Sequence, residues 1–211
     1  MNQTKPKVLV ICETNFIYSN GFRRDRNCVY LLDLSKTGKI ELAIPEFSFY
    51  EIKHAVNQTF KKRSGELYRV YSFLNELIKS EQHASTFSEV KEKFKQLELD
   101  SPSEKLGVLN SAEEIKSLCI PIPYDLNIFY KAHLRSIADM PPHKDNDRRI
   151  YESILEFVNR EKNSYDLKLF YTADREDFDH PELHEELGKI EVELYFSSGK
   201  VLERLREYYA R

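Results

Sequence analysis

Apolar and polar residues follow one another in segments that predict strands separated by helices. The continuous apolar run at residues 7–12 is typical of a strand that is covered on both faces in a parallel sheet. Residues 39–44, which stop before Pro45, and residues 167–171 are rich in strand-forming side chains and predict two further strands. Residues 191–196 alternate between polar and apolar positions, so we expect an edge strand with one solvent-exposed face.

Apolar residues spaced three and four apart predict helices between these strands. The expected helices span residues 46–62, 67–79, 87–97, 125–138, 147–159 and 201–209. A capping box, Ser111-x-x-Glu114, predicts the start of a further short helix. This order of elements predicts a three-layer α/β/α sandwich with a central, mostly parallel sheet of four or five strands.

The chain has 211 residues, a length that favours a single domain over residues 1–211. A polar, charge-rich stretch predicts a helical insertion at residues 61–110 within that domain. With 41% hydrophobic residues and a formal net charge of -3, the composition is that of an ordinary globular protein and excludes the disordered and low-complexity classes.

The cysteine pattern points to a reducing compartment. Cys12, Cys28 and Cys119 are odd in number and include no Cys-x-x-Cys pair, so we expect free thiols, no zinc ribbon and a cytoplasmic location. The first apolar run is far shorter than a membrane span of about 20 residues, and we therefore expect no membrane partner.

Acidic residues follow the predicted strands at the positions where an open parallel sheet binds ligands. Glu13 directly follows the first strand, Glu51 lies six residues after Pro45, and Asp174 follows the third predicted strand. Asp147 opens the helix before that strand. Clustered carboxylates raise one another's pKa values, and a divalent ion relieves this repulsion. Oxygen-only ligands favour Mg²⁺ or Mn²⁺.

These residues resemble the PIN-domain nuclease family. The family pattern is an apolar strand that ends in Asp-x-Asn, a later Pro-x5-Glu, an Asp that starts a helix, and a Thr-x-Asp. The matching segments, in chain order, are Glu13-Thr-Asn15, Pro45 to Glu51, Asp147-Arg-Arg-Ile150 and Thr172-Ala-Asp174. The resemblance spans residues 7–211 outside the insertion. It implies a metal-dependent endoribonuclease that cleaves RNA phosphodiester bonds with a metal-activated water.

The resemblance also implies roles for individual residues. The catalytic, metal-holding carboxylates would be Glu13, Glu51, Asp147 and Asp174. Asn15 and Thr172 would orient carboxylates, while Asp177 would bind a second ion or support its loop. Arg148 and Arg149, beside one carboxylate, are candidate phosphate contacts.

One departure from the family pattern opens an alternative function. Glu13 stands where the family has Asp, and its side chain is longer by one methylene, which shifts a bound ion. Displacements of about 1 Å can cost on the order of 100-fold in rate. The alternative is therefore a catalytically weak or inactive PIN-like module that binds RNA or a protein partner.

Other readings of the same residues stay open. Most of the 35 acidic residues must be solvated surface groups, Asp147 and Asp174 are also good helix N-caps, and Asp145 competes with Asp147 for the third motif. A metal-dependent phosphatase has less support, because no Asp-x-Asp follows the first strand. The resemblance permits an inhibitory protein partner and a homodimer. It leaves open the RNA target, the cleavage of DNA, and the setting, whether a toxin with an antitoxin, phage defence or RNA processing.

Overall fold

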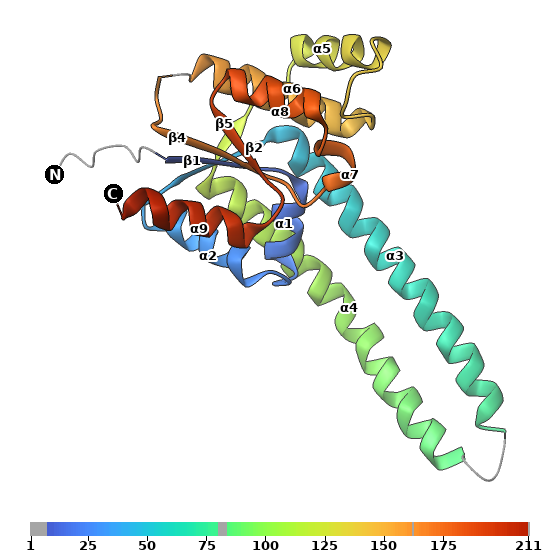
Figure 1. Ribbon diagram of the computed structural model, residues 1–211. Coiled ribbons are helices and arrows are strands. Elements are labelled where there is room, and N and C mark those ends of the chain that lie inside the picture. Colours follow the sequence, from blue (N-terminus) through green and yellow to red (C-terminus); the bar gives the residue numbers. More distant parts are fainter. Residues whose placement is uncertain (1–7, 80–83, 162, 211) are drawn as a thin grey trace. The chain divides into compact units, whose positions relative to one another are not determined.

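The computed structural model describes residues 8–79, 84–161 and 163–210. Its centre is a five-stranded sheet in the order β3-β2-β1-β4-β5, in which all neighbouring strands are parallel (Figure 1). The strands are β1 (Val8–Cys12), β2 (Glu41–Pro45), β3 (Ile120–Ile122), β4 (Leu167–Tyr171) and β5 (Val192–Tyr195). The predicted α/β fold with a mostly parallel sheet is thereby confirmed.

The strand pattern explains which strand lies at the centre and which at the edge. β1 is buried at all five positions and pairs with β2 on one side and β4 on the other, as its continuous apolar run predicts. β5 is an edge strand with partly exposed positions, as its alternation predicts. β3 was not predicted, because Ile-Pro-Ile is only three residues long and Pro121 lacks a backbone donor.

Helices cover both faces of the sheet (Figure 1). On one face lie α1 (Thr14–Gly21), α2 (Arg26–Lys36) and α9 (Ser198–Tyr209). On the other face lie α6 (Asp145–Arg160) and α8 (Pro181–Lys189), with α5 (Leu126–Ile137) packed on α6, while the short α7 (Arg175–Phe178) follows β4. The predicted apolar face of α6, which includes Ile150, Ile154 and Val158, lies in one buried cluster with Leu9 and Phe170 of the sheet.

The chain divides into two compact units. The first comprises Met1–Ile52 and Ser111–Arg211, and the second comprises Lys53–Asn110. The second unit is formed by parts of two long helices, α3 (Glu46–Leu77) and α4 (Ala84–Leu118). Within it, Arg63 forms an ion pair with Glu104, and the Lys91 Nζ donates to the Asn75 Oδ1 at 2.8 Å. These pairs show that the two helices run antiparallel. The placement of an insertion at residues 61–110 stays a prediction.

The predicted helix boundaries in this region are wrong. The helices predicted at residues 46–62 and 67–79 form one helix that Gly65 does not interrupt and that ends at Leu77. Ser111 lies inside α4 rather than at the start of a helix. Pro102 also lies within α4. The antiparallel helices bury Leu67, Leu74 and Val108, and this burial outweighs the local preference of glycine, proline and the capping box for a helix end.

Within the described ranges, no helix combines the length and the apolar character that crossing a membrane requires.

Candidate functional site

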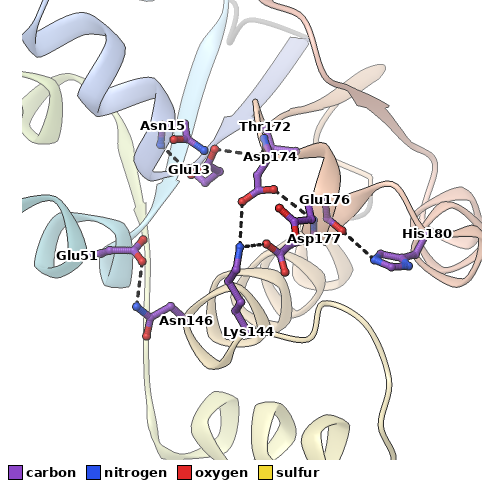
Figure 2. Close-up of polar contacts among 10 residues, drawn as sticks. All are labelled: Glu13, Asn15, Glu51, Lys144, Asn146, Thr172, Asp174, Glu176, Asp177 and His180. Carbon is purple, nitrogen blue, oxygen red and sulfur yellow. Dashed lines mark hydrogen bonds and ion pairs between the residues drawn. The ribbon is translucent and has the colours of Figure 1, made fainter. Parts of the chain in front are cut away.

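Acidic side chains gather at the carboxyl ends of β1 and β4 (Figure 2). Asp147, in the first turn of α6, adds another carboxylate to them. The parallel pairing of Cys12 with Tyr171 brings the residues that follow these two strands side by side. As a result the Thr172 Oγ1 donates to the Glu13 Oε1 at 3.1 Å, although the two residues are 159 positions apart in the chain. The position expected for ligands in an open parallel sheet is therefore acidic here.

The tightest acidic group consists of Asp147, Asp174 and Asp177. One carboxylate oxygen from each residue lies within 4.8 Å of those of the other two. Asp177 is buried, while Asp147 and Asp174 are half-buried. Three carboxylates at this spacing form an oxygen-only ligand set, which suits a hard divalent cation such as Mg²⁺ or Mn²⁺. The family resemblance predicts the metal-holding role for four carboxylates and an ion-binding or loop-supporting role for Asp177; the four are Glu13, Glu51, Asp147 and Asp174.

Asp147 lies in the first turn of α6, among other negative charges. Its pKa is raised from 3.8 to about 7, first by burial and then by repulsion from Asp177, Glu51, Asp174 and Glu13. A cation between the carboxylates relieves this repulsion. The electrostatics of the site therefore fit a bound divalent ion.

Glu13 is the N-cap of α1 and is only 4% exposed. Burial raises the pKa of its carboxyl from 4.5 to about 7, hydrogen bonds from Asn15 and Thr172 oppose that shift, and repulsion from Glu51 adds to it. The backbone N–H of Asn15 donates to the Glu13 Oε2 at 2.7 Å. Glu13 thus lies beside the three aspartates but outside their group, and its role as a metal ligand stays a prediction.

Thr172 and Asn15 each donate a hydrogen bond to the carboxyl of Glu13, which fixes its orientation. The Thr172 Oγ1 donates to Glu13 and accepts the backbone N–H of Asp174 at 3.0 Å, so this one hydroxyl connects two acidic residues. Asp174 is itself the N-cap of α7 and accepts the backbone N–H of Asp177 at 3.2 Å. Asp174 is therefore both a helix N-cap and a member of the acidic group.

Glu51 lies in α3, within the first unit, and is held from two other helices. The Asn146 Nδ2, from the first turn of α6, donates to the Glu51 Oε1 at 2.9 Å. The hydroxyl of Thr14 donates to the Glu51 Oε2. Sequence reasoning missed Thr14 and Asn146, although each directly follows or precedes a predicted site residue, which was the available signal.

Lys144, which the sequence analysis also missed, places a positive charge in the acidic group (Figure 2). Its ammonium donates to the Asp177 Oδ2 and lies 3.7 Å from the Asp174 Oδ2. The hydrogen bond to Asp177, together with the charges of Asp174, Asp177 and Asp147, raises the pKa of Lys144 against the opposing effect of burial. Its position three residues before Asp147 was the signal that could have found it.

The two candidate phosphate contacts differ in burial, since Arg148 is buried and Arg149 is half-buried. Arg148 is buried, and its Nη1 donates to the Ser136 Oγ at 2.9 Å and to the Asp145 Oδ1 at 3.0 Å. The guanidinium of Arg149 lies over the ring of Phe47, 5.2 Å from the centroid. Asp145, the rival of Asp147 in the third motif, thus pairs with Arg148, and only Asp147 joins the acidic group. Phosphate binding by both arginines stays a prediction.

Comparisons with known proteins give one family match and one distant structural likeness. Residues 10–178 match a family model described as PIN domain. A search of curated proteins finds no match. Among solved structures, a crystal structure of VapBC2 from Rickettsia felis bound to a DNA fragment from their promoter matches with a TM-score of 0.44 and 12% identity, covering 89% of this chain and 98% of that chain. A likeness this distant says nothing about activity.

Proposed function

The chain belongs to the PIN domain family, a family of nucleases, and we propose that it is a metal-dependent endoribonuclease that cleaves RNA at this acidic site. The observation that carries the proposal is the convergence of Asp147, Asp174 and Asp177, whose ligand oxygens lie within 4.8 Å of one another. These three residues would hold Mg²⁺ or Mn²⁺. When bound, such an ion lowers the pKa of a water molecule and neutralises charge on the phosphate.

The other residues of the site prepare it for this chemistry. Thr172 and Asn15 fix the carboxyl of Glu13 by donating to its two oxygens. Held in this way, Glu13 is our proposed further ligand of the ion, as the family resemblance implies. Asn146 and Thr14 hold Glu51 in the same way, so that it completes the acidic site. Arg149, which is only half-buried, is our proposed phosphate contact.

The setting of the enzyme belongs to the same proposal. Cys12, Cys28 and Cys119 are free thiols, which is in keeping with a cytoplasmic location. An inhibitory protein partner and a homodimeric state are proposed from the family resemblance and await direct measurement.

The second candidate function is a PIN-like module that binds RNA or a protein partner without cutting. The observation that favours it is the position of Glu13, whose carboxyl is engaged by Asn15 and Thr172 and lies outside the group of three aspartates. If the ion needs a ligand at this position, the longer side chain leaves the site incomplete. Binding without cleavage would follow.

A cleavage assay separates these functions. Purified protein is incubated with labelled mixed-sequence RNA in Mn²⁺, in Mg²⁺ and in EDTA, beside the variant Asp174→Asn. The matched control is Asp33→Asn, which makes the same change at an exposed position of α2. We expect metal-dependent cleavage by the unchanged protein and by the control, and a loss of at least about 100-fold in Asp174→Asn, the size seen when a catalytic group is removed.

Each other outcome has a definite meaning. Cleavage that persists in EDTA, or that Asp174→Asn retains, contradicts the proposed mechanism and indicates a contaminating ribonuclease. RNA that is bound by the protein but stays intact in both metals supports the binding module instead.

A further inference from the structure

We propose that Lys144 is a built-in counter-ion of the acidic group, which the divalent ion displaces and which then contacts the substrate phosphate. This inference rests on the proposed function, because it concerns the same three aspartates. It adds a residue that the family pattern quoted above does not contain, and it couples metal loading to substrate binding.

The ammonium of Lys144 contacts carboxylates that are proposed to bind the ion. The ammonium donates to the Asp177 Oδ2 and lies 3.7 Å from the Asp174 Oδ2, so it engages two of the three aspartates (Figure 2). The Asp177 side chain is only 7% exposed and the Asp174 side chain 29% exposed. The ammonium thus compensates carboxylates that are partly or wholly removed from water.

An ammonium and a divalent ion cannot share these oxygens. A divalent ion takes carboxylate oxygens at about 2.0–2.6 Å, and it repels a neighbouring positive charge that uses the same ligands. With twice the charge, the ion interacts more strongly with Asp147, Asp174 and Asp177 than the ammonium does. Metal binding and the Lys144 ion pairs therefore exclude one another.

The structure allows the side chain to leave without disturbing the fold. The Lys144 side chain is 59% exposed, and its four-carbon stem is flexible. Its backbone is fixed, since its carbonyl accepts the N–H of Arg148 at 3.0 Å at the start of α6. Lys168, by contrast, could not leave its partner so easily, because its side chain is only 2% exposed and pairs with Glu191 from within the sheet. Only the end of the Lys144 side chain has to move.

A displaced ammonium stays at the rim of the site. Lys144 precedes Asp147 by three residues, so its stem still begins beside the acidic group. A phosphate held by the ion lies at this rim, and lysine binds phosphate as a point charge. Lys144 would therefore exchange a carboxylate partner for a phosphate partner when the site is loaded.

The first test measures Mn²⁺ binding by calorimetry in the absence of RNA. The variant Lys144→Gln removes the competing charge, and Lys189→Gln removes a lysine of similar exposure that pairs with Glu185 on α8. We expect Lys144→Gln to bind Mn²⁺ about 10-fold more tightly than the unchanged protein, a factor that corresponds to about 1.4 kcal/mol. Lys189→Gln should bind as the unchanged protein does. Equal affinities in all three proteins would overturn the competition.

The second test follows the ammonium itself. Lysines of the unchanged protein are labelled with an amine-reactive acylating reagent, and the labelling of Lys144 is measured by mass spectrometry relative to Lys189. We expect labelling of Lys144 to rise several-fold at saturating Mn²⁺ and to fall again when an excess of a mixed-sequence RNA oligonucleotide is added. Labelling that Mn²⁺ leaves unchanged contradicts displacement, and labelling that RNA leaves unchanged contradicts the phosphate contact.

These outcomes are distinct from a failure of the proposed function. If neither the unchanged protein nor Lys144→Gln binds Mn²⁺, the metal site itself is wrong and the counter-ion proposal falls with it. If both bind Mn²⁺ with the same affinity, the metal site stands and only the role of Lys144 is wrong.

Discussion

Glu13 is the residue at which this chain departs from the family pattern, and its surroundings decide how it behaves. Its carboxyl is 4% exposed, and burial raises its pKa from 4.5 to about 7. The folded protein therefore holds a proton on Glu13 at pH values where the unfolded chain has released it. Asp147 behaves in the same way, because burial and neighbouring carboxylates raise its pKa from 3.8 to about 7.

This difference predicts that metal-free protein loses stability as the pH rises. Between about pH 4.5 and pH 7 the folded state binds more protons than the unfolded state, so the free energy of unfolding falls with rising pH. Glu13→Gln keeps the side chain neutral at every pH. We expect this variant to flatten the pH dependence and to be more stable than the unchanged protein at pH 8, by about 3 kcal/mol for a shift of this size.

Chemical denaturation in EDTA at pH 5 and pH 8 measures this effect. Glu207→Gln, at an exposed position of α9, is the matched control and should change neither stability nor its pH dependence. A Glu13→Gln variant that is less stable than the unchanged protein at pH 8 would show that the charged form of Glu13 is the favoured one.

The sequence predicts the acidic residues of the site better than it predicts their partners. Glu13, Asp147 and Asp174 could be found because strand ends and helix starts are visible in the apolar pattern. The contacts of Lys144 and Asn146 could not be found, because they depend on the directions of side chains on separate elements. The same holds for Arg148, whose inward hydrogen bonds depend on α5.

At the scale of elements, Arg135 connects several helices on one face of the sheet. From α5, its Nε donates to the Glu152 Oε1 of α6 at 2.7 Å and its Nη2 to the Glu186 Oε2 of α8 at 2.8 Å. Its Nη1 donates to the carbonyl of Pro141 at 2.7 Å, in the segment between α5 and α6. Its guanidinium also lies over the ring of Tyr151, 4.9 Å from the centroid.

Arg135→Met should therefore destabilise the protein strongly. The change leaves two carboxylates and one carbonyl without their donor, and removing one partner of a buried ion pair costs about 3–5 kcal/mol. We expect about 3 kcal/mol, since the side chain of Glu186 is 24% exposed and remains partly hydrated. Denaturant unfolding measures the loss.

Lys131→Met is the matched control for this prediction, because Lys131 also connects α5 to α6. It pairs with Glu156 through side chains that are 40% and 29% exposed, and such pairs contribute about 1 kcal/mol or less. If Arg135→Met costs no more than Lys131→Met, the buried network does not hold these helices together.

The elements that the sequence predicted wrongly are those in which local preference and packing disagree. The strands β1, β2 and β4 were predicted from apolar, strand-forming residues and β5 from its alternating pattern, whereas the short β3 has too few residues to show a pattern. In α3 and α4, a glycine and a capping box favour helix ends, but the apolar residues that the two helices bury keep each of them continuous. That burial depends on a partner helix, which a local pattern does not reveal.

Gly65 gives a test of this explanation. A Cβ added there meets nothing within 4 Å among the described atoms, and glycine inside a helix costs about 0.5–1 kcal/mol relative to alanine. We expect Gly65→Ala to stabilise α3 by about that amount, which slows hydrogen exchange of its amides a few-fold. Gly38→Ala is the control and should destabilise the protein, because Gly38 has a φ of 70° that alanine adopts only with strain. Faster exchange in Gly65→Ala would indicate that α3 is broken at this position.

At the scale of the whole molecule, the acidic site takes only Glu51 from the two long helices, and Glu51 lies in the part of α3 that belongs to the first unit. Asp147, Asp174, Asp177 and Glu13 also lie in the first compact unit, whereas the described residues of the second unit belong mainly to α3 and α4. A parallel β-α-β crossover needs a connection of about a dozen residues, and the connection from β2 to β3 is much longer than that. We therefore expect most of α3 and α4 to be dispensable for building the sheet.

We therefore predict that a shortened chain folds and still binds metal. Arg63 and Glu104 form an ion pair across the two helices, so a four-residue polar loop can replace residues 64–103 between these positions. We expect the shortened protein to bind Mn²⁺ within about 2-fold of the affinity of the full chain, because its ligand residues are unchanged. Calorimetry measures that affinity, and Asp174→Asn in the shortened chain controls for nonspecific binding. A shortened chain that does not fold would show that residues 61–110 are part of the domain core and not an insertion.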